Sequence, residues 1–169
     1  VTELNNFENF GCVDGYQRAG GVLGAGAIST LNHCANYGDL GTKEGAKSFR
    51  WNGGIVATSA NGTQKTSNVV VLDCANFGNI KVASTAVGGI FGSPSGNASF
   101  SIERCANFGR IYSGGTYAGG ISGQVSGIAI NGNIADCVNY GRVTAVTSHC
   151  AGVAPISMAT WGGKAAWTY

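Results

Sequence analysis

Apolar and polar residues alternate over short runs along the whole chain. "NVVVL" at 68–72, "IKVAS" at 80–84, "RIYSG" at 110–114 and "RVTAV" at 142–146 are rich in Val, Ile, Thr and Tyr. No stretch keeps a 3.6-residue period long enough for a helix, and glycines separate the runs. The pattern therefore predicts an all-β chain of short strands and tight turns, with no substantial helix.

Two phrases recur in alternation. "CANYGDL" at 34–40 returns as "CANFGNI" at 74–80, "CANFGRI" at 105–111 and "CVNYGRV" at 137–143, so that the cysteines are spaced by 40, 31 and 32 residues. Between them lie "GGVLG" at 20–24, "GGIVA" at 53–57, "GGIFG" at 88–92, "GGISG" at 119–123 and "AGVAP" at 151–155. A period of this length indicates a repeat architecture, and short strands without helices at that period indicate a β-solenoid.

We expect residues 1–169 to form a single β-solenoid domain, a parallel β-helix of about five coils with about 32 residues per coil. The predicted boundaries are a partial coil at 1–19, coils at about 20–52, 53–87, 88–118 and 119–150, and a partial coil at 151–169. "LNNFENFG" at 4–11 aligns with "LNHCANYG" at 31–38, so the chain begins and ends halfway through a unit. Because these half-units are complementary, we expect subunits to stack head-to-tail into a filament.

Equivalent residues of successive coils should lie above one another and form ladders. We expect stacked asparagine amides at a buried corner, glycines with positive φ two residues later, and free cysteine thiols that fill the interior as small hydrophobic groups, together with Leu31, Leu72, Ile102 and Ile134. The predicted ladder consists of Cys34, Cys74, Cys105, Cys137, Asn9, Asn36, Asn76, Asn107, Asn139, Gly38, Gly78, Gly109 and Gly141.

An aromatic residue stands between each of these asparagines and the glycine that follows it. This column, formed by Phe10, Tyr37, Phe77, Phe108 and Tyr140, either packs inward at the corner or forms a ridge on the outside. We expect the inward arrangement, because a regular apolar row is usually buried.

The repeated pattern GGhhG followed by hxxCxNxGxV resembles the GLUG motif, which occurs in tandem in large bacterial surface proteins and in similar arrays of anaerobic protists. The unit closest to that motif is "AGGISGQVSGIAINGNIADCVNYGRVTA" at 118–145, and the resemblance covers nearly the whole chain. It implies an extracellular or cell-surface solenoid that serves in attachment or as a scaffold, and it implies no catalytic residue.

Charge and composition exclude several classes of function. Only 11% of the residues are charged and the formal net charge is +2, which argues against a nucleic-acid partner and leaves little repulsion between copies. No run of 18 apolar residues is present, so we expect no membrane insertion. Without a CxxC or HxxxH spacing, the cysteines and the two histidines predict no metal site, and we expect no cofactor.

Catalysis is a remote alternative, because parallel β-helices also carry polysaccharide-active enzymes. The eight carboxylates share no column and form no acid/base pair, and no nucleophile motif is evident, so we predict no catalytic residue.

We predict a non-enzymatic structural protein, a subunit or segment of an extracellular β-solenoid filament or stalk. Its partner is a second copy stacked head-to-tail or the neighbouring repeats of a longer chain. The alternative is a cell-surface adhesion or carbohydrate-binding module that uses aromatic residues outside the repeat column, namely Tyr16, Trp51, Tyr112, Tyr117, Trp161 and Trp167.

Four further residues are candidates for covalent modification. Cys12 and Cys150 lie outside the cysteine ladder and near opposite ends, so they could form a disulfide across a stacked junction but not within one subunit. The sequons at Asn61 and Asn97 predict N-glycosylation if the host is eukaryotic.

Overall fold

The computed structural model describes residues 3–15, 17–26, 28–42, 50–58, 68–83, 85–94, 99–125 and 131–155, and within these ranges the only regular elements are β-strands. Sheet A contains β1 (Glu3–Asn5), β5 (Thr30–Asn32), β10 (Asn68–Leu72), β15 (Ser99–Glu103) and β19 (Asn131–Ala135). Sheet B contains β2 (Glu8–Asn9), β6 (Ala35–Asn36), β11 (Ala75–Asn76), β16 (Ala106–Asn107) and β20 (Val138–Asn139).

Three further sheets complete the coils. Sheet C contains β3 (Val13–Gly15), β7 (Leu40–Thr42), β12 (Ile80–Val82), β17 (Ile111–Ser113) and β21 (Val143–Ala145). Sheet D contains β8 (Trp51–Gly53), β13 (Ala86–Gly88), β18 (Tyr117–Gly119) and β22 (His149–Ala151). Sheet E contains β4 (Leu23–Ala25), β9 (Val56–Thr58) and β14 (Phe91–Ser93).

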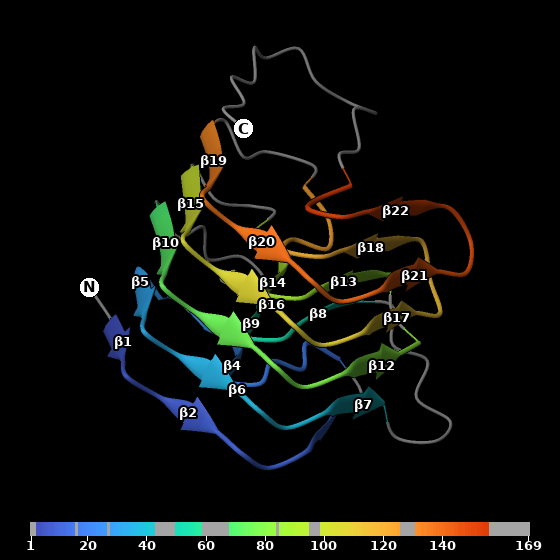
Figure 1. Ribbon diagram of the computed structural model, residues 1–169, viewed down its shortest axis with the longest axis horizontal. Coiled ribbons are helices and arrows are strands. Elements are labelled where there is room, and N and C mark those ends of the chain that lie inside the picture. The colour runs from blue at the N-terminus through green and yellow to red at the C-terminus, as the bar shows by residue number, and fades with distance from the viewer. Residues whose placement is uncertain are drawn as a thin grey trace.

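Each strand pairs in parallel with the equivalent strand of the next coil, so the strands rise in tiers from the N-terminal to the C-terminal end (Figure 1). The first glycine of each repeat marks the register: Gly20 lies beside Gly53, Gly53 beside Gly88, Gly88 beside Gly119, and Gly119 beside Ala151. The fold is therefore a parallel β-solenoid, as the sequence predicted, and the repeat glycines form a column in space.

Two apolar clusters fill the interior. The larger one contains Leu31, Ile55, Val71, Phe91 and their equivalents in other coils, and the smaller one contains Leu40, Ile80, Val87 and Ile111 beside sheets C and D. Strand alternation selects these residues: in β12, Ile80 and Val82 are buried and Lys81 between them is exposed.

The register corrects the expected position of Leu72. Val71, which is fully buried, pairs with Leu31 and Ile102 in the interior column, whereas Leu72 pairs with Asn32 and Glu103 and is half-buried. Because side chains alternate along a strand, an alignment error of one residue moves a side chain to the other face of the sheet.

The corner between sheets A and B is turned by the residue that precedes the cysteine column. His33, Asp73, Arg104 and Asp136 have φ between 50° and 53°, and Asn6 has φ of 61°. Asp73 and Asp136 share this column, so the expectation that no two carboxylates share a column is wrong. The expectation that the repeat glycines Gly38, Gly78, Gly109 and Gly141 supply positive φ is wrong, since none of them lies in that region. Glycine is required there for another reason: a Cβ on Gly78 would lie 2.0 Å from the carbonyl oxygen of Gly38 in the coil below.

Candidate assembly and binding surfaces

A continuous ladder of asparagine amides runs through sheet B. Asn36, Asn76 and Asn107 are fully buried, and the amide nitrogen of each donates both to the carbonyl oxygen of the glycine two residues later and to the amide oxygen of the asparagine in the next coil, at 2.7–2.9 Å. Asn9 donates to Asn36 at 2.7 Å. The predicted amide ladder is confirmed, and every ladder donor points toward the C-terminal end.

The direction of this ladder makes its two ends chemically different. At the N-terminal end, the amide oxygen of Asn9 accepts a hydrogen bond from the backbone nitrogen of Gly11 but from no asparagine of the described residues. At the C-terminal end, the amide nitrogen of Asn139 donates to the carbonyl oxygen of Gly141 and has no asparagine above it in the described part of the chain. One end thus offers an acceptor and the other offers a donor.

Two glycine columns run beside the ladder. A Cβ on Gly109 or Gly141 would lie 1.9 Å from a carbonyl oxygen of the coil below, and a Cβ on Gly54, Gly89 or Gly120 would lie 1.9–2.1 Å from a carbonyl oxygen of the coil above. The outermost members differ. A Cβ on Gly11 would lie 3.7 Å from its nearest neighbour, and a Cβ on Gly152 has no described atom within 4 Å.

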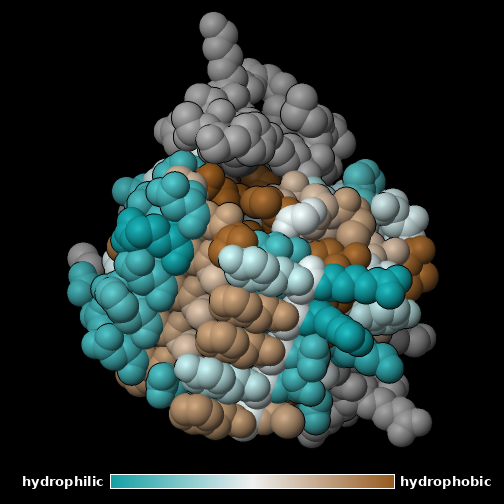
Figure 2. Space-filling view, viewed as in Figure 1, coloured by the Kyte–Doolittle hydropathy of each residue, from teal (hydrophilic) through white to brown (hydrophobic). Residues whose placement is uncertain are grey.

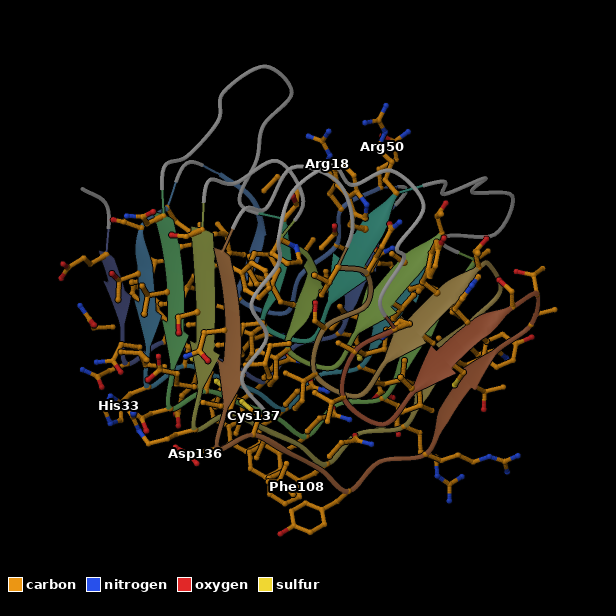
Figure 3. The ribbon with its side chains drawn as sticks, turned by 90° about the horizontal axis from the view of Figure 1, so that it is seen from above. Arg18, His33, Arg50, Phe108, Asp136 and Cys137 are labelled. Atoms are coloured by element: carbon orange, nitrogen blue, oxygen red, sulfur yellow. The ribbon has the colours of Figure 1, made fainter. Side chains whose placement is uncertain are left out.

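The aromatic column lies on the outside, so the expectation of inward packing is wrong. The rings of Phe10, Tyr37, Phe77 and Phe108 stack in parallel with centroids 4.8 Å apart, and Tyr140 follows at 5.1 Å. Figure 2 shows the row in the middle of one face, and Figure 3 shows Phe108 pointing away from the coils. Because strand alternation buries the neighbouring asparagine and glycine, the ring between them must face outward.

Stacking decides which part of each ring is accessible. The three inner rings are 42–45% exposed, whereas Phe10 and Tyr140, which have one stacked neighbour each, are 70% and 69% exposed. Within the ladder the ring faces cover one another and the ring edges meet solvent. The outer faces of the two terminal rings are the only ring faces in the ladder that no other ladder ring covers.

Two charged columns follow the aromatic ladder on its C-terminal side. The first contains Cys12, Asp39, Asn79, Arg110 and Arg142, and the second contains Asp14, Gly41, Lys81, Tyr112 and Thr144. In the first column, Asp39 accepts from the backbone nitrogen of Asn79 at 2.7 Å, and Asn79 accepts from the backbone nitrogen of Arg110 at 3.1 Å. Carboxylates occupy the N-terminal part of these columns and arginines the C-terminal part.

The cysteine column is buried and reduced. Cys34, Cys74 and Cys105 are buried and Cys137 is half-buried, and each sulfur accepts a long hydrogen bond of 3.4 Å from the backbone nitrogen of the cysteine below it, where one is present. Hydrogen bonding between neighbouring thiols and burial raise the pKa of Cys34 and Cys105 above the usual value for a thiol. The predicted interior position of the cysteine column is confirmed, although Cys137 is less covered than expected.

Cys12 and Cys150 are both exposed and free. Cys12 belongs to the outward column of Arg142, whereas Cys150 lies beside buried Ala118 in an inward column. The register therefore gives no support to a disulfide between them across a junction, and that disulfide stays a prediction.

Several predicted residues lie outside the described part of the chain, namely the sequon residues Asn61 and Asn97 and the aromatic residues Tyr16, Trp161 and Trp167. Of the described aromatic residues, Trp51 lies under the guanidinium group of Arg18 at 5.6 Å, and Tyr117 stacks on His149 at 4.8 Å. Tyr112 stands in the second charged column and is 42% exposed.

The sequence reasoning overlooked Lys81, Arg110 and Arg142. Each is exposed, and the three lie in adjacent coils. Writing the residues that follow the repeat glycine as one column would have found the two arginines. Lys81 joins them only through the register between sheet C strands.

Over the described ranges, no group of three His, Cys, Asp or Glu side chains could hold a metal ion, and no helix is long and apolar enough to cross a membrane. The chain matches no protein-family model, no curated protein and no solved structure. The resemblance to GLUG repeats therefore rests on the motif residues alone.

Proposed function

We propose that the protein is a non-enzymatic structural element of a longer extracellular β-solenoid, in which further coils of the same kind stack head-to-tail on both of its ends. These coils come from a second copy or from neighbouring repeats of a longer chain. The observation that carries the proposal is the directional amide ladder, which leaves an acceptor at Asn9 and a donor at Asn139. The extracellular location is supported by the resemblance to GLUG repeats.

Continuing the register defines the junction. Asn9 of the next copy would lie above Asn139 and accept its amide hydrogen, and Gly11 would lie above Gly141. Phe10 of the next copy would stack on Tyr140, so that the outer faces of both terminal rings become covered. The inner rings of the ladder are already covered on both faces in this way. The junction therefore repeats contacts that every pair of coils in the chain already makes.

The polarity of the ends favours a head-to-tail arrangement. Two N-terminal ends brought together would oppose two amide acceptors and the carboxylates of Asp14 and Asp39, and two C-terminal ends would oppose amide donors and arginines. Contact between unlike ends is heterologous and does not close on itself, so it generates a filament.

The terminal glycines supply an independent argument. A methyl group at Gly11 or Gly152 would not clash with any described residue, so no contact among the described residues requires glycine at either position. In a head-to-tail stack, a Cβ on Gly11 would meet the carbonyl oxygen of Gly141 of the copy below, as the Cβ of Gly38 would meet that of Gly11. A Cβ on Gly152 would meet Gly21 of the copy above in the same way.

The test compares assembly of the wild-type chain with that of Gly11→Ala and Gly152→Ala by light scattering and electron microscopy. We expect the wild type to form filaments with a subunit rise of about 24 Å, five strands at about 4.8 Å each. At concentrations at which the wild type is still monomeric, each glycine variant should keep the wild-type melting temperature, and at higher concentrations it should lose filament growth. Ala75→Ser, which adds one heavy atom at a half-exposed position in a middle coil, is the matched control and should assemble normally. Filaments that persist in both glycine variants would overturn the head-to-tail proposal.

The alternative of a sugar-binding aromatic row gains no support from the ladder itself. Sugar rings contact aromatic side chains through the ring face, and the faces of the inner rings are covered by their neighbours.

A further inference from the structure

A shallow groove of about 570 Å³ lies over sheet C, beside the aromatic ladder. Its wall contains Lys81, Arg110, Tyr112, Arg142 and Thr144, together with Asn79 and two isoleucines. Lys81, Tyr112 and Thr144 follow one another in register along one column, and Arg110 and Arg142 follow one another in the adjacent column. The groove therefore runs along the solenoid axis and crosses three successive coils.

Among the described residues, the positive charges in this groove have no carboxylate within ion-pair distance. The ion pairs of the described residues that lie within 4.0 Å join Arg104 to Asp73 and to Glu103, on another face, and none includes Lys81, Arg110 or Arg142. No carboxylate of the described ranges lines the groove, although Asp14 and Asp39 line its continuation toward the N-terminal end. Three like charges at the spacing of adjacent strands repel one another, and a bound anion would relieve that repulsion.

Tyr112 adds a surface of a different kind. It is 42% exposed, and no aromatic ring among the described residues stacks on it, in contrast to the rings of the ladder. A tyrosine ring that is not stacked on another aromatic ring can contact the carbon–hydrogen face of a sugar ring. The half-buried hydroxyl of Thr144, next in the same column, can donate to or accept from a sugar hydroxyl.

We propose that this groove binds a linear anionic polysaccharide, with carboxylate or sulfate groups along the chain, laid parallel to the solenoid axis. The guanidinium groups of Arg110 and Arg142 would each hold an acidic group through paired hydrogen bonds, and Lys81 would hold a third as a point charge. Tyr112 would stack on the sugar between them. This inference goes beyond the structural role. Lys81, Arg110 and Tyr112 lie below the coil that would meet a second copy, whereas Arg142 and Thr144 lie in that coil.

Other polyanions fit the groove less well. A net charge of +2 is far from the basic footprint of a nucleic-acid-binding protein. An acidic polypeptide would satisfy the arginines but would gain nothing specific from the ring face of Tyr112.

The experiment measures binding of the full chain to polygalacturonate, to dextran sulfate, to uncharged dextran and to polyglutamate by isothermal titration calorimetry at low ionic strength. Binding of either charged polysaccharide is expected, and the two probes separate carboxylate from sulfate as the recognised group. Uncharged dextran should not bind. Arg110→Gln should weaken binding about tenfold, the effect of one charge-assisted hydrogen-bonded contact. Arg104→Gln removes another exposed arginine, from a different face, and should leave the affinity within about twofold.

Tyr112→Ala distinguishes a glycan site from a general anion site. It should weaken binding of the charged polysaccharide several-fold and leave any residual binding of polyglutamate unchanged, while the melting temperature stays at the wild-type value. Equal losses in Arg104→Gln and Arg110→Gln, or polyglutamate binding as tight as that of both polysaccharides, would overturn the proposal. So would the absence of binding to both charged polysaccharides. Filament formation is scored separately, so failure of either proposal leaves the other intact.

Discussion

Replacing Asn76 with alanine should destabilise the protein far more than an ordinary surface substitution. Asn76 is fully buried in the middle of the amide ladder. Its amide oxygen accepts a hydrogen bond from Asn36, and its amide nitrogen donates to the carbonyl oxygen of Gly78 and to the amide oxygen of Asn107. The alanine variant therefore leaves one donor of Asn36 and two acceptors without partners, in a region that water does not reach.

The size of the effect follows from the number of groups left without partners. Each buried group that loses its hydrogen bond costs about 1–3 kcal/mol, so three such groups are expected to lower the free energy of unfolding by about 3–9 kcal/mol. A domain of this size has a total stability of about 5–15 kcal/mol. Asn79→Ala, three residues away, also removes an amide side chain with hydrogen bonds, but Asn79 is exposed and water replaces its partners. The control should cost about 1 kcal/mol or less.

Urea denaturation followed by circular dichroism measures both variants. Asn76→Asp sharpens the test, because an ionised carboxylate cannot donate to the oxygens of Gly78 and Asn107. Burial and these two acceptors should raise the pKa of the new carboxyl group, so the aspartate variant should gain stability relative to the wild type as the pH falls through that raised value. The ladder account is refuted if Asn76→Ala costs no more than Asn79→Ala.

Three further outcomes are expected from other parts of the solenoid. Gly78→Ala should lower the free energy of unfolding by at least about 1–3 kcal/mol, because its Cβ would lie 2.0 Å from the carbonyl oxygen of Gly38. Gly11→Ala, the control, should melt like the wild type. Equal melting temperatures of the Gly78→Ala and Gly11→Ala variants would contradict the close approach of the coils. A thiol reagent should label exposed Cys12 and Cys150 quickly in the native protein, and it should label Cys34, Cys74 and Cys105 only in denaturant. Mass spectrometry of the labelled chain measures the difference. Rapid labelling of the three buried thiols in the native protein would contradict the packed interior. Hydrogen bonding from Arg104 lowers the pKa of Asp73 below its usual value of 3.8, so the small stabilisation from this pair should be present above that pH and disappear as the pH falls through the lower folded-state value. Chemical denaturation of the wild type and of Asp73→Asn over that pH range tests this prediction. A stability advantage of the wild type that grows on acidification would contradict it.

The fold and the ladder were predictable because a solenoid converts a sequence period into a spatial column. The recurrence of a cysteine and an asparagine in fixed order was enough to place Asn36 under Asn76, and Cys34 under Cys74, with no knowledge of the turns. The direction of the aromatic ladder could also have been read, because Tyr37 stands one residue from buried Asn36 and strand alternation turns it outward. The hydrophobicity of the aromatic rings predicted an inward position, but the alternation of side chains along the strand placed them outward.

The steric role of the glycines was beyond the reach of the local sequence. A glycine needed for positive φ and a glycine needed for close approach look identical in one repeat, and only the distance between Gly38 and Gly78 separates the two causes. The groove was hidden for a related reason. Lys81, Tyr112 and Arg142 come from three different repeats and meet only when the strands of sheet C are in register.

The central claim is that unlike ends of the solenoid bind each other. The most direct test of this claim mixes the two glycine variants. Gly11→Ala closes the N-terminal end and keeps an open C-terminal end, and Gly152→Ala does the reverse. Sedimentation of an equimolar mixture should therefore show a dimer of the two variants and no longer species, while each variant alone stays monomeric. A mixture that remains monomeric, or that grows into filaments, would contradict head-to-tail stacking through these ends.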